Sequence, residues 1–306
     1  MSVQPEEVLV ASTGVIGMHL PMERIRDGVH VCAATLAASE QAADAAAKSI
    51  ITTDTHQKEL AVSFEIDGKT CHIGAMEKGS GMIHPNMGTM LCFLTTDVCI
   101  SRDMLQKALL DVTQDTFNMI SVDGDTSTND TALLLANGEA HNAEITEEDE
   151  SYHVFFEALL HVCTELAKML AGDGEGATAL FEVCVQGAPD RDCARTLAKS
   201  VICSSLTKAA IFGHDANWGR ILCALGYAGA DFDPDKTSLV IKSAAGSLLL
   251  FEHGAPVSYS EEEATRILSE PVVRAEADLH MGDASATAWG CDLSYDYVKI
   301  NADYRS

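Results

Sequence analysis

The most informative stretch of the sequence is Lys78-Gly-Ser-Gly-Met-Ile-His-Pro-Asn-Met-Gly88-Thr89-Met-Leu91. A threonine hydroxyl is a weak nucleophile unless a base lies beside it, and a cut before Thr89 would free an α-amine that serves as this base. Gly88 tolerates the strained backbone in which a hydroxyl reaches the preceding carbonyl. The motif therefore favours an enzyme that makes its own catalytic terminus. A glycine-rich junction between a loop and a strand is the plainer alternative.

Composition narrows the class of protein. A chain of 306 residues, 47% apolar and 22% charged, is typical of a globular protein with one large domain or two ordinary ones. Its formal charge of −26 argues against nucleic acid and anionic membranes as partners, since both would repel it. The sequence shows neither a secretory signal pattern nor an apolar run of membrane-spanning length, so we expect a cytoplasmic protein.

No pattern indicates a metal or a cofactor. The ten cysteines lack the short spacing of zinc ligands, and we interpret them as small buried thiols in a reducing compartment. The segment from Asp123 to Asp130 resembles a calcium loop but has Thr128 at its sixth position and Leu134 at its twelfth, where glycine and glutamate belong. We expect a hydrogen-bonded turn near the site there. No glycine pattern matches a nucleotide-binding loop.

Hydrophobic periodicity predicts mixed secondary structure. Residues 60–66 and 70–75 flank Asp67-Gly68 and predict a hairpin, and 8–11, 239–242, 247–251 and 273–279 also favour strands. Helices are expected over 33–49, after Ser101, over 155–171, from about 190 to 206, and after the capping box of Ser260 and Glu263. Mixed strands and helices without strict alternation favour a layered α+β fold.

Six blocks of the chain carry a family resemblance. In order along the chain they are Ala11-Ser-Thr-Gly-Val-Ile-Gly17, Lys78-Gly-Ser-Gly through Leu91, Val122-Asp-Gly-Asp-Thr-Ser-Thr-Asn-Asp-Thr131, Gly172-Asp-Gly-Glu-Gly-Ala-Thr178, Asn217-Trp-Gly-Arg220 and Tyr295-Asp-Tyr-Val-Lys-Ile-Asn-Ala-Asp-Tyr304. With them the chain resembles the glutamate N-acetyltransferase family, also called ornithine acetyltransferase, of arginine biosynthesis. Each block alone is weak evidence, but six in order over nearly the whole chain are specific.

The resemblance implies a fold and an activity. The fold is an α-β-β-α sandwich of the self-cleaving N-terminal-nucleophile type, with a smaller α/β part. Residues 1–140 would form the N-terminal part of the catalytic domain, including the cleavage site, and residues 151–306 the α/β part that completes the substrate site. The implied activity moves acetyl from N-acetyl-L-ornithine to L-glutamate, and use of acetyl-CoA as a donor is left open. Two α and two β chains would make a hetero-tetramer.

The resemblance also implies site residues. Thr89 would be the nucleophile after a cut between Gly88 and Thr89, and Thr13 with Gly14 would form the oxyanion hole. The positions that match substrate-binding residues are Thr52, Lys78, Thr89, Glu175, Asn301 and Ser306. Sequence does not separate Thr52 from its neighbour Thr53. Without the family, each of these positions also fits an ordinary turn, a surface charge or a frayed terminus.

One departure from the family bears on these expectations. Family members carry roughly a hundred residues, a large part of a domain, before the segment that begins here at Glu6. Three explanations are open: a truncated fragment, a second polypeptide that supplies the rest, or a degenerate member of the family. Two alternative functions follow. One is an amidase or aminopeptidase with an N-terminal nucleophile, and the other is an inactive truncated subunit.

Overall fold

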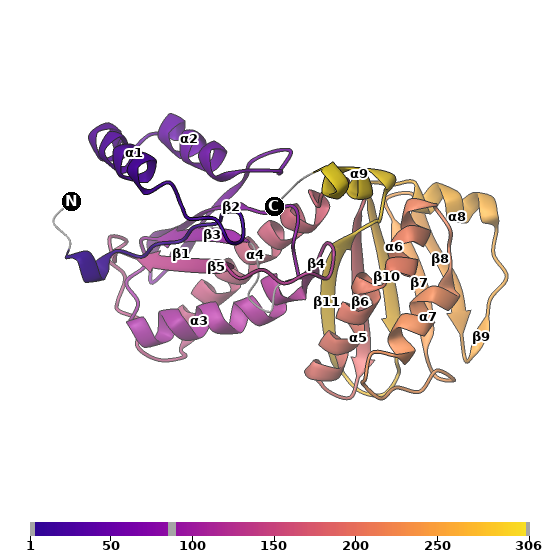
Figure 1. Cartoon of the computed structure of the whole chain (residues 1–306). Helices are drawn as coiled ribbons and strands as arrows, with labels where there is room; N and C mark the ends of the chain where they lie inside the picture. Colours follow the sequence, from indigo (N-terminus) through magenta and orange to yellow (C-terminus); the bar gives the residue numbers. More distant parts are fainter. Residues whose placement is uncertain (1–3, 85–89, 304–306) are drawn as a thin grey trace.

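The protein is an α+β structure built on two sheets (Figure 1). The computed structural model describes residues 4–84 and 90–303. The four-stranded sheet has the order β1 (Lys58–Ile66), β2 (Lys69–Lys78), β3 (Leu91–Thr96), β5 (Thr131–Ala136). The seven-stranded sheet has the order β4 (Ile120–Ser121), β11 (Ala284–Cys291), β6 (Leu180–Ala188), β10 (Val272–Asp278), β7 (Ser238–Ser243), β8 (Gly246–Glu252), β9 (Ala255–Pro256).

The predicted hairpin is present and forms β1 and β2. Ile66 pairs with Lys69, and the two turn residues Asp67 and Gly68 have φ angles of 52° and 69°. Positive φ at both central positions is the geometry that an Asp-Gly turn favours, because its twist matches that of the strands. The register pairs Lys58 with Glu77, which places the end of β2 beside the start of β1.

Helix α4 (Glu150–Gly172) packs against both sheets. Asp149 caps it, accepting a hydrogen bond of 2.9 Å from the backbone N–H of Tyr152. Its apolar stripe is buried, and the ring of Phe155 lies 6.5 Å from that of Phe64 on β1. Figure 1 shows α3 (Arg102–Asp115) beside α4, below the four-stranded sheet. The predicted cap of α3 is confirmed, since Ser101 accepts from the N–H of Met104.

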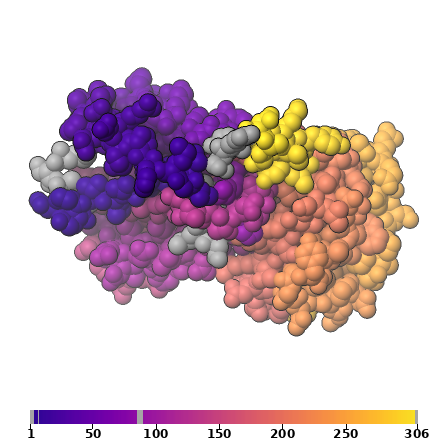
Figure 2. All heavy atoms as spheres, viewed as in Figure 1, coloured from indigo at the N-terminus to yellow at the C-terminus, as the bar shows by residue number. Residues whose placement is uncertain are grey.

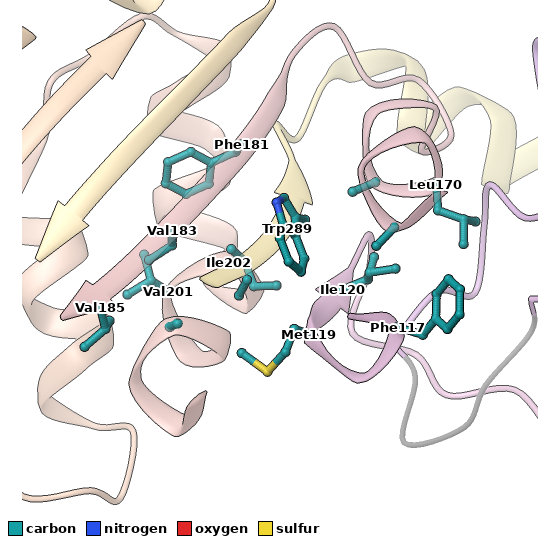
Figure 3. Close-up of a cluster of buried hydrophobic side chains, with 14 of the residues drawn as sticks. Phe117, Met119, Ile120, Leu170, Phe181, Val183, Val185, Val201, Ile202 and Trp289 are labelled. Carbon is teal, nitrogen blue, oxygen red and sulfur yellow. The ribbon is translucent and has the colours of Figure 1, made fainter. Parts of the chain in front are cut away.

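The core continues from α4 into the seven-stranded sheet. Figure 3 shows Leu170 of α4 close to Ile120, with Trp289 of β11 between Ile120 and the Phe181 side of the sheet. Helices α5 (Arg191–Cys203), α6 (Ser205–Phe212) and α7 (Trp218–Gly226) lie on one face of this sheet (Figure 1). The predicted cap of α8 (Glu261–Leu268) is confirmed, since Ser260 accepts from the N–H of Glu263, which is the serine half of the capping box.

The N-terminal segment lies outside this core. A short 3-10 helix, Pro5–Glu7, is followed by α1 (Met22–Thr35), whose residues are all exposed, and by α2 (Glu40–Ile50). Figure 2 shows these indigo residues on the outer surface of the molecule. Exposed apolar side chains along the segment include Val10, Ile16 and Met18.

Four expectations about local structure are wrong. Residues 8–11 are not a strand, because this segment forms no strand ladder within the described residues. The helix expected over 33–49 is two helices, since Ser39 caps α2 by accepting from the N–H of Ala42. The helix expected to reach 206 ends at Cys203, where Ser204 caps α6. Cys32 and Cys223 are exposed rather than buried thiols.

The two sheets divide the chain close to the expected boundary. The four-stranded sheet uses residues 58–136, and most of the seven-stranded sheet follows residue 180. Strand β4 is the exception, because it precedes the boundary yet pairs in parallel with β11. The division into residues 1–140 and 151–306 stays a prediction. Among the described residues, no helix is long and apolar enough to cross a membrane.

Candidate functional site

A pocket of about 280 Å³ gathers most of the predicted site residues. Thr13, Gly14, Thr52, Lys78, Glu175 and Asn301 all line it. They come from five separate segments of the chain, and the pocket has formed where the N-terminal part meets the C-terminal helix α9 (Tyr295–Asp303). Figure 2 shows this yellow helix beside the indigo and purple N-terminal part.

Lys78 supplies the cation of the pocket. It ends β2, and its residue is only 4% exposed. Burial lowers the pKa of its ammonium group, while the carboxylates of Asp54 and Asp130 act in the opposite direction. Within residues 4–84 and 90–303 the ammonium makes no hydrogen bond or ion pair. A buried cation that lines a pocket in this state is suited to bind an anionic group of a ligand.

Glu175 supplies the carboxylate of the pocket. Its Oε2 accepts a hydrogen bond of 2.9 Å from the side-chain amide of Asn301, and its backbone N–H donates to the carbonyl of Ser80. The carboxylate lies against Gly81, where a Cβ atom would be 2.3 Å from the carboxyl carbon. Glycine is therefore required at position 81 for Glu175 to keep this place.

Helix α9 is held against the loop that carries Glu175. A Cβ atom on Gly176, whose φ is 70°, would lie 2.5 Å from the backbone nitrogen of Tyr297. Ser294 donates from its hydroxyl to the carbonyl of Gly176 over 2.5 Å. This close approach brings Asn301, two turns along α9, to the carboxylate of Glu175.

The remaining walls come from Thr13-Gly14, Thr52-Thr53 and residues 127–129. The side-chain amide of Asn129 donates to the carbonyl of Ser12 over 2.9 Å, which joins the N-terminal segment to the 122–131 turn. Both Thr52 and Thr53 line the pocket, so the structure does not choose between them. The turn at 123–130 does lie at the site, and Asp123 accepts from the backbone N–H groups of Met82 and Ile83.

Three predicted residues, Gly88, Thr89 and Ser306, lie outside the described residues. Met90, which follows Thr89 in sequence, is described. Its N–H donates to Oδ1 of Asp130, and the next residue, Leu91, pairs with Lys78. Burial raises the pKa of Asp130 to about 7. Met90 and Leu91, which follow Thr89 in sequence, therefore lie beside Lys78.

Sequence reasoning missed several pocket residues. Ser80, Met82, Ser127, Thr128 and Asn129 line the pocket, as do Val15 and Ile16. Most belong to blocks that carry the family resemblance, which is the signal that could have found them. Within the described part of the chain, no group of three or more metal-ligating side chains is present.

The sequence matches a known protein family and several of its members. The model of the ArgJ family matches residues 1–306. The arginine biosynthesis bifunctional protein ArgJ of Symbiobacterium thermophilum is 53% identical over all 306 residues, which cover 75% of that protein. ArgJ 1 of Clostridium acetobutylicum is 51% identical over 306 residues, covering 74% of it.

A solved structure supports the same assignment. The crystal structure of the ArgJ protein from Bacillus halodurans is 46% identical with a TM-score of 0.66, and the match covers 69% of this chain and 98% of that one. The similarity confirms the predicted fold class, an α+β sandwich of the N-terminal-nucleophile type with a smaller α/β part. With the whole chain matched by the family model and by relatives about half identical to it, the chain belongs to the ArgJ family.

Proposed function

We propose that this protein is an acetyltransferase of arginine biosynthesis that moves acetyl from N-acetyl-L-ornithine to L-glutamate. The observation that carries the proposal is that Lys78 and Glu175 line the same pocket. Lys78 is a buried cation and Glu175 a carboxylate held by Asn301. An amino acid presents a carboxylate and an ammonium group, so a pocket with one charge of each sign is complementary to it. The relatives' names as arginine biosynthesis proteins support the pathway.

The proposed activation is a cut between Gly88 and Thr89. The hydroxyl of Thr89 attacks the carbonyl of Gly88, the acyl group moves from nitrogen to oxygen, and water hydrolyses the ester. The products are residues 1–88 and 89–306, and the second chain begins with a free α-amine. One observation supports the cut. Met90, the residue after Thr89, lies beside the pocket, because its N–H donates to Asp130 and the next residue, Leu91, pairs with Lys78.

The proposed transfer uses the same hydroxyl. With the α-amine taking its proton, the Thr89 oxygen attacks the acetyl carbonyl, and the negative charge that forms on the carbonyl oxygen is met by Thr13 and Gly14. Ornithine leaves with the proton, and acetyl remains on Thr89 as an ester. The amine of glutamate then attacks this ester and regenerates the hydroxyl. Thr52, Asn301 and Ser306 would contact the substrate.

We propose a hetero-tetramer of two α and two β chains in the cytoplasm. The relatives are named bifunctional, which fits an enzyme with two activities, and we propose acetyl-CoA as a second acetyl donor.

The test is a two-substrate assay on the purified protein. Incubation with N-acetyl-L-ornithine and L-glutamate should yield N-acetyl-L-glutamate and ornithine, with the parallel double-reciprocal lines of a ping-pong route. Release of free acetate that does not depend on glutamate would contradict the transferase and favour an amidase. Failure of the isolated chain to fold would favour an inactive truncated subunit.

A further inference from the structure

A fully buried lysine is linked to the walls of the pocket through Asp54. Lys58 begins β1 and is 0% exposed. Its Nζ lies 2.7 Å from Oδ1 of Asp54 and 2.6 Å from Oδ2 of Asp173, and both carboxylate side chains are at most 3% exposed. Burying three charges is favourable only where each is paired and hydrogen-bonded. The carboxylate oxygens of Asp54 and Asp173 therefore need further hydrogen-bond donors besides Lys58.

Those partners belong to the walls of the pocket. Oδ1 of Asp54 also accepts from the N–H of Gly79 over 2.7 Å, and Oδ2 accepts from the N–H of Thr52 over 3.2 Å. Asp173 accepts from the N–H of Thr55, and its backbone carbonyl accepts from the hydroxyl of Ser80 over 2.7 Å. Asp54 thus joins the wall that carries Thr52 to the wall that carries Lys78.

We propose that Asp54, held by Lys58 and by the backbone of Gly79, is the positioning residue for the ligand-binding cation Lys78. The proposal rests on the function proposed above, in which Lys78 binds the substrate carboxylate. Asp54 lines no part of the pocket and acts through its neighbours. Oδ1 of Asp54 accepts a hydrogen bond from the N–H of Gly79, the residue that directly follows Lys78. Asp54 therefore fixes the position of the backbone that carries the Lys78 side chain.

Charge gives Asp54 a second effect on Lys78. The charged groups that act on Lys78 are Asp54 and Asp130, which raise the pKa of its ammonium group, and Lys58, which lowers it. Burial lowers that pKa more than these charges shift it. Glu77 lies next to Lys78 in sequence, but burial raises its pKa to about 8 and leaves it largely neutral at pH 7. The carboxylate of Asp173 affects the pKa of Lys78 less than that of Asp54 does.

The two carboxylates of Lys58 therefore make a matched pair for a test. Asp54→Asn keeps the shape of the side chain but removes the charge near Lys78. Asp173→Asn makes the same change on the other side of Lys58. Without the Asp54 carboxylate the pKa of Lys78 falls further, so the cation is lost at a lower pH. We expect Asp54→Asn to raise KM for N-acetylornithine about tenfold at neutral pH, by weakening an interaction of a charged group.

The pH profile separates this role from a merely structural one. In Asp54→Asn the rise of KM at alkaline pH should begin at lower pH than in wild type, and in Asp173→Asn it should stay where it is. Asp54→Glu, which keeps the charge on a longer side chain, should raise KM without moving the alkaline rise. The proposal would be overturned if KM of Asp54→Asn began to rise at the same pH as in wild type. It would also be overturned if Asp173→Asn or Asp54→Glu lowered that pH as much as Asp54→Asn does.

Amide hydrogen exchange tests the positioning independently of any activity. In full-length Asp54→Asn, the one remaining oxygen cannot accept from the N–H of Thr52 and the N–H of Gly79 in their present places, so exchange at one or both of these amides should quicken at least tenfold. The control is Ile66→Val, a core change at the far end of the same strand, which should leave both amides as in wild type. If wild type transfers no acetyl, the proposed function fails and this exchange still tests Asp54. Unchanged exchange in Asp54→Asn would refute its positioning role.

Discussion

The side-chain amide of Asn301 donates a hydrogen bond of 2.9 Å to Oε2 of Glu175, across 126 residues of chain. The bond joins the last helix, α9, to the loop that follows α4. It sets the carboxylate of Glu175 at the pocket by orienting one of its two oxygens. Because Glu175 is only 9% exposed, the other oxygen can interact with a ligand with little competition from bulk water.

Glu175→Gln should weaken substrate binding while leaving the fold intact. The glutamine keeps the size of the side chain and loses the charge that faces a substrate ammonium group. Interactions of charged groups contribute about 1.5–3 kcal/mol, so kcat/KM should fall roughly 10- to 100-fold. The control is Glu165→Gln on α4, where the carboxylate pairs with Lys168 at the surface. Equal kcat/KM in wild type and Glu175→Gln would remove Glu175 from the site.

Gly81→Ala should lower activity by displacing Glu175. The new methyl group would lie 2.3–2.5 Å from the carboxylate atoms of Glu175, so that side chain must move. Kinetics and thermal melting should show a loss of kcat/KM at least tenfold with a cooperative unfolding transition retained. Gly28→Ala in α1 is the matched control, because nothing lies within 4 Å of its Cβ position. An active Gly81→Ala protein would show that the place of Glu175 is not needed.

Lys78→Met should raise KM and remove a pH effect. Substrate carboxylate binding needs the charged ammonium, whose pKa is lowered by burial. Wild-type KM should therefore rise as pH increases through a pKa below the usual lysine value of 10.5. In Lys78→Met, KM should be high at neutral pH and show no such rise. Lys48→Met, which removes an exposed lysine paired with Asp44, should keep the wild-type profile.

Glu77 should make the protein less stable as pH rises. Its side chain is fully buried, and its carboxyl oxygens have no hydrogen-bond partner among the described residues. Burial raises its pKa from 4.5 to about 8, so between these values the unfolded chain releases a proton that the folded chain keeps. The free energy of unfolding should then fall by about 1.4 kcal/mol per pH unit across that window, because the stability contributed by the protonated group is lost as pH rises.

Glu77→Met is the variant that measures this effect. It removes both unpartnered oxygens, so the free energy of unfolding should rise at pH 8 and lose this slope between pH 4.5 and 8. Urea unfolding at several pH values measures it. The exposed Glu65→Gln on the same hairpin should leave the slope unchanged. A Glu77→Met protein with the wild-type slope would show that Glu77 is ionised in the folded state.

Sequence predicted the parts of the structure that depend on local rules. The Asp67-Gly68 hairpin and the caps at Ser101 and Ser260 follow from residues a few positions apart. The buried ion pairs of Lys58 could not be predicted from the sequence. Lys58 contacts Asp173 across 115 residues of chain, and no local pattern indicates that Lys58 is buried. Most candidate site residues were found through the family blocks, and the pocket shows that six of them lie together. The strand predicted over residues 8–11 was wrong because the apolar residues of this segment are exposed rather than paired in a sheet.

If Thr89 becomes the catalytic N-terminus, the purified protein must consist of two chains rather than one. Intact mass and end-sequencing of wild type should find two pieces, of 88 and 218 residues (306 minus 88), with the larger one beginning Thr-Met-Leu. Thr89→Ala should remain one chain of 306 residues without transfer activity, and Thr89→Ser should retain some cleavage because a primary hydroxyl can still attack. A wild-type protein that transfers acetyl as an uncut chain, or an active Thr89→Ala protein, would contradict the account.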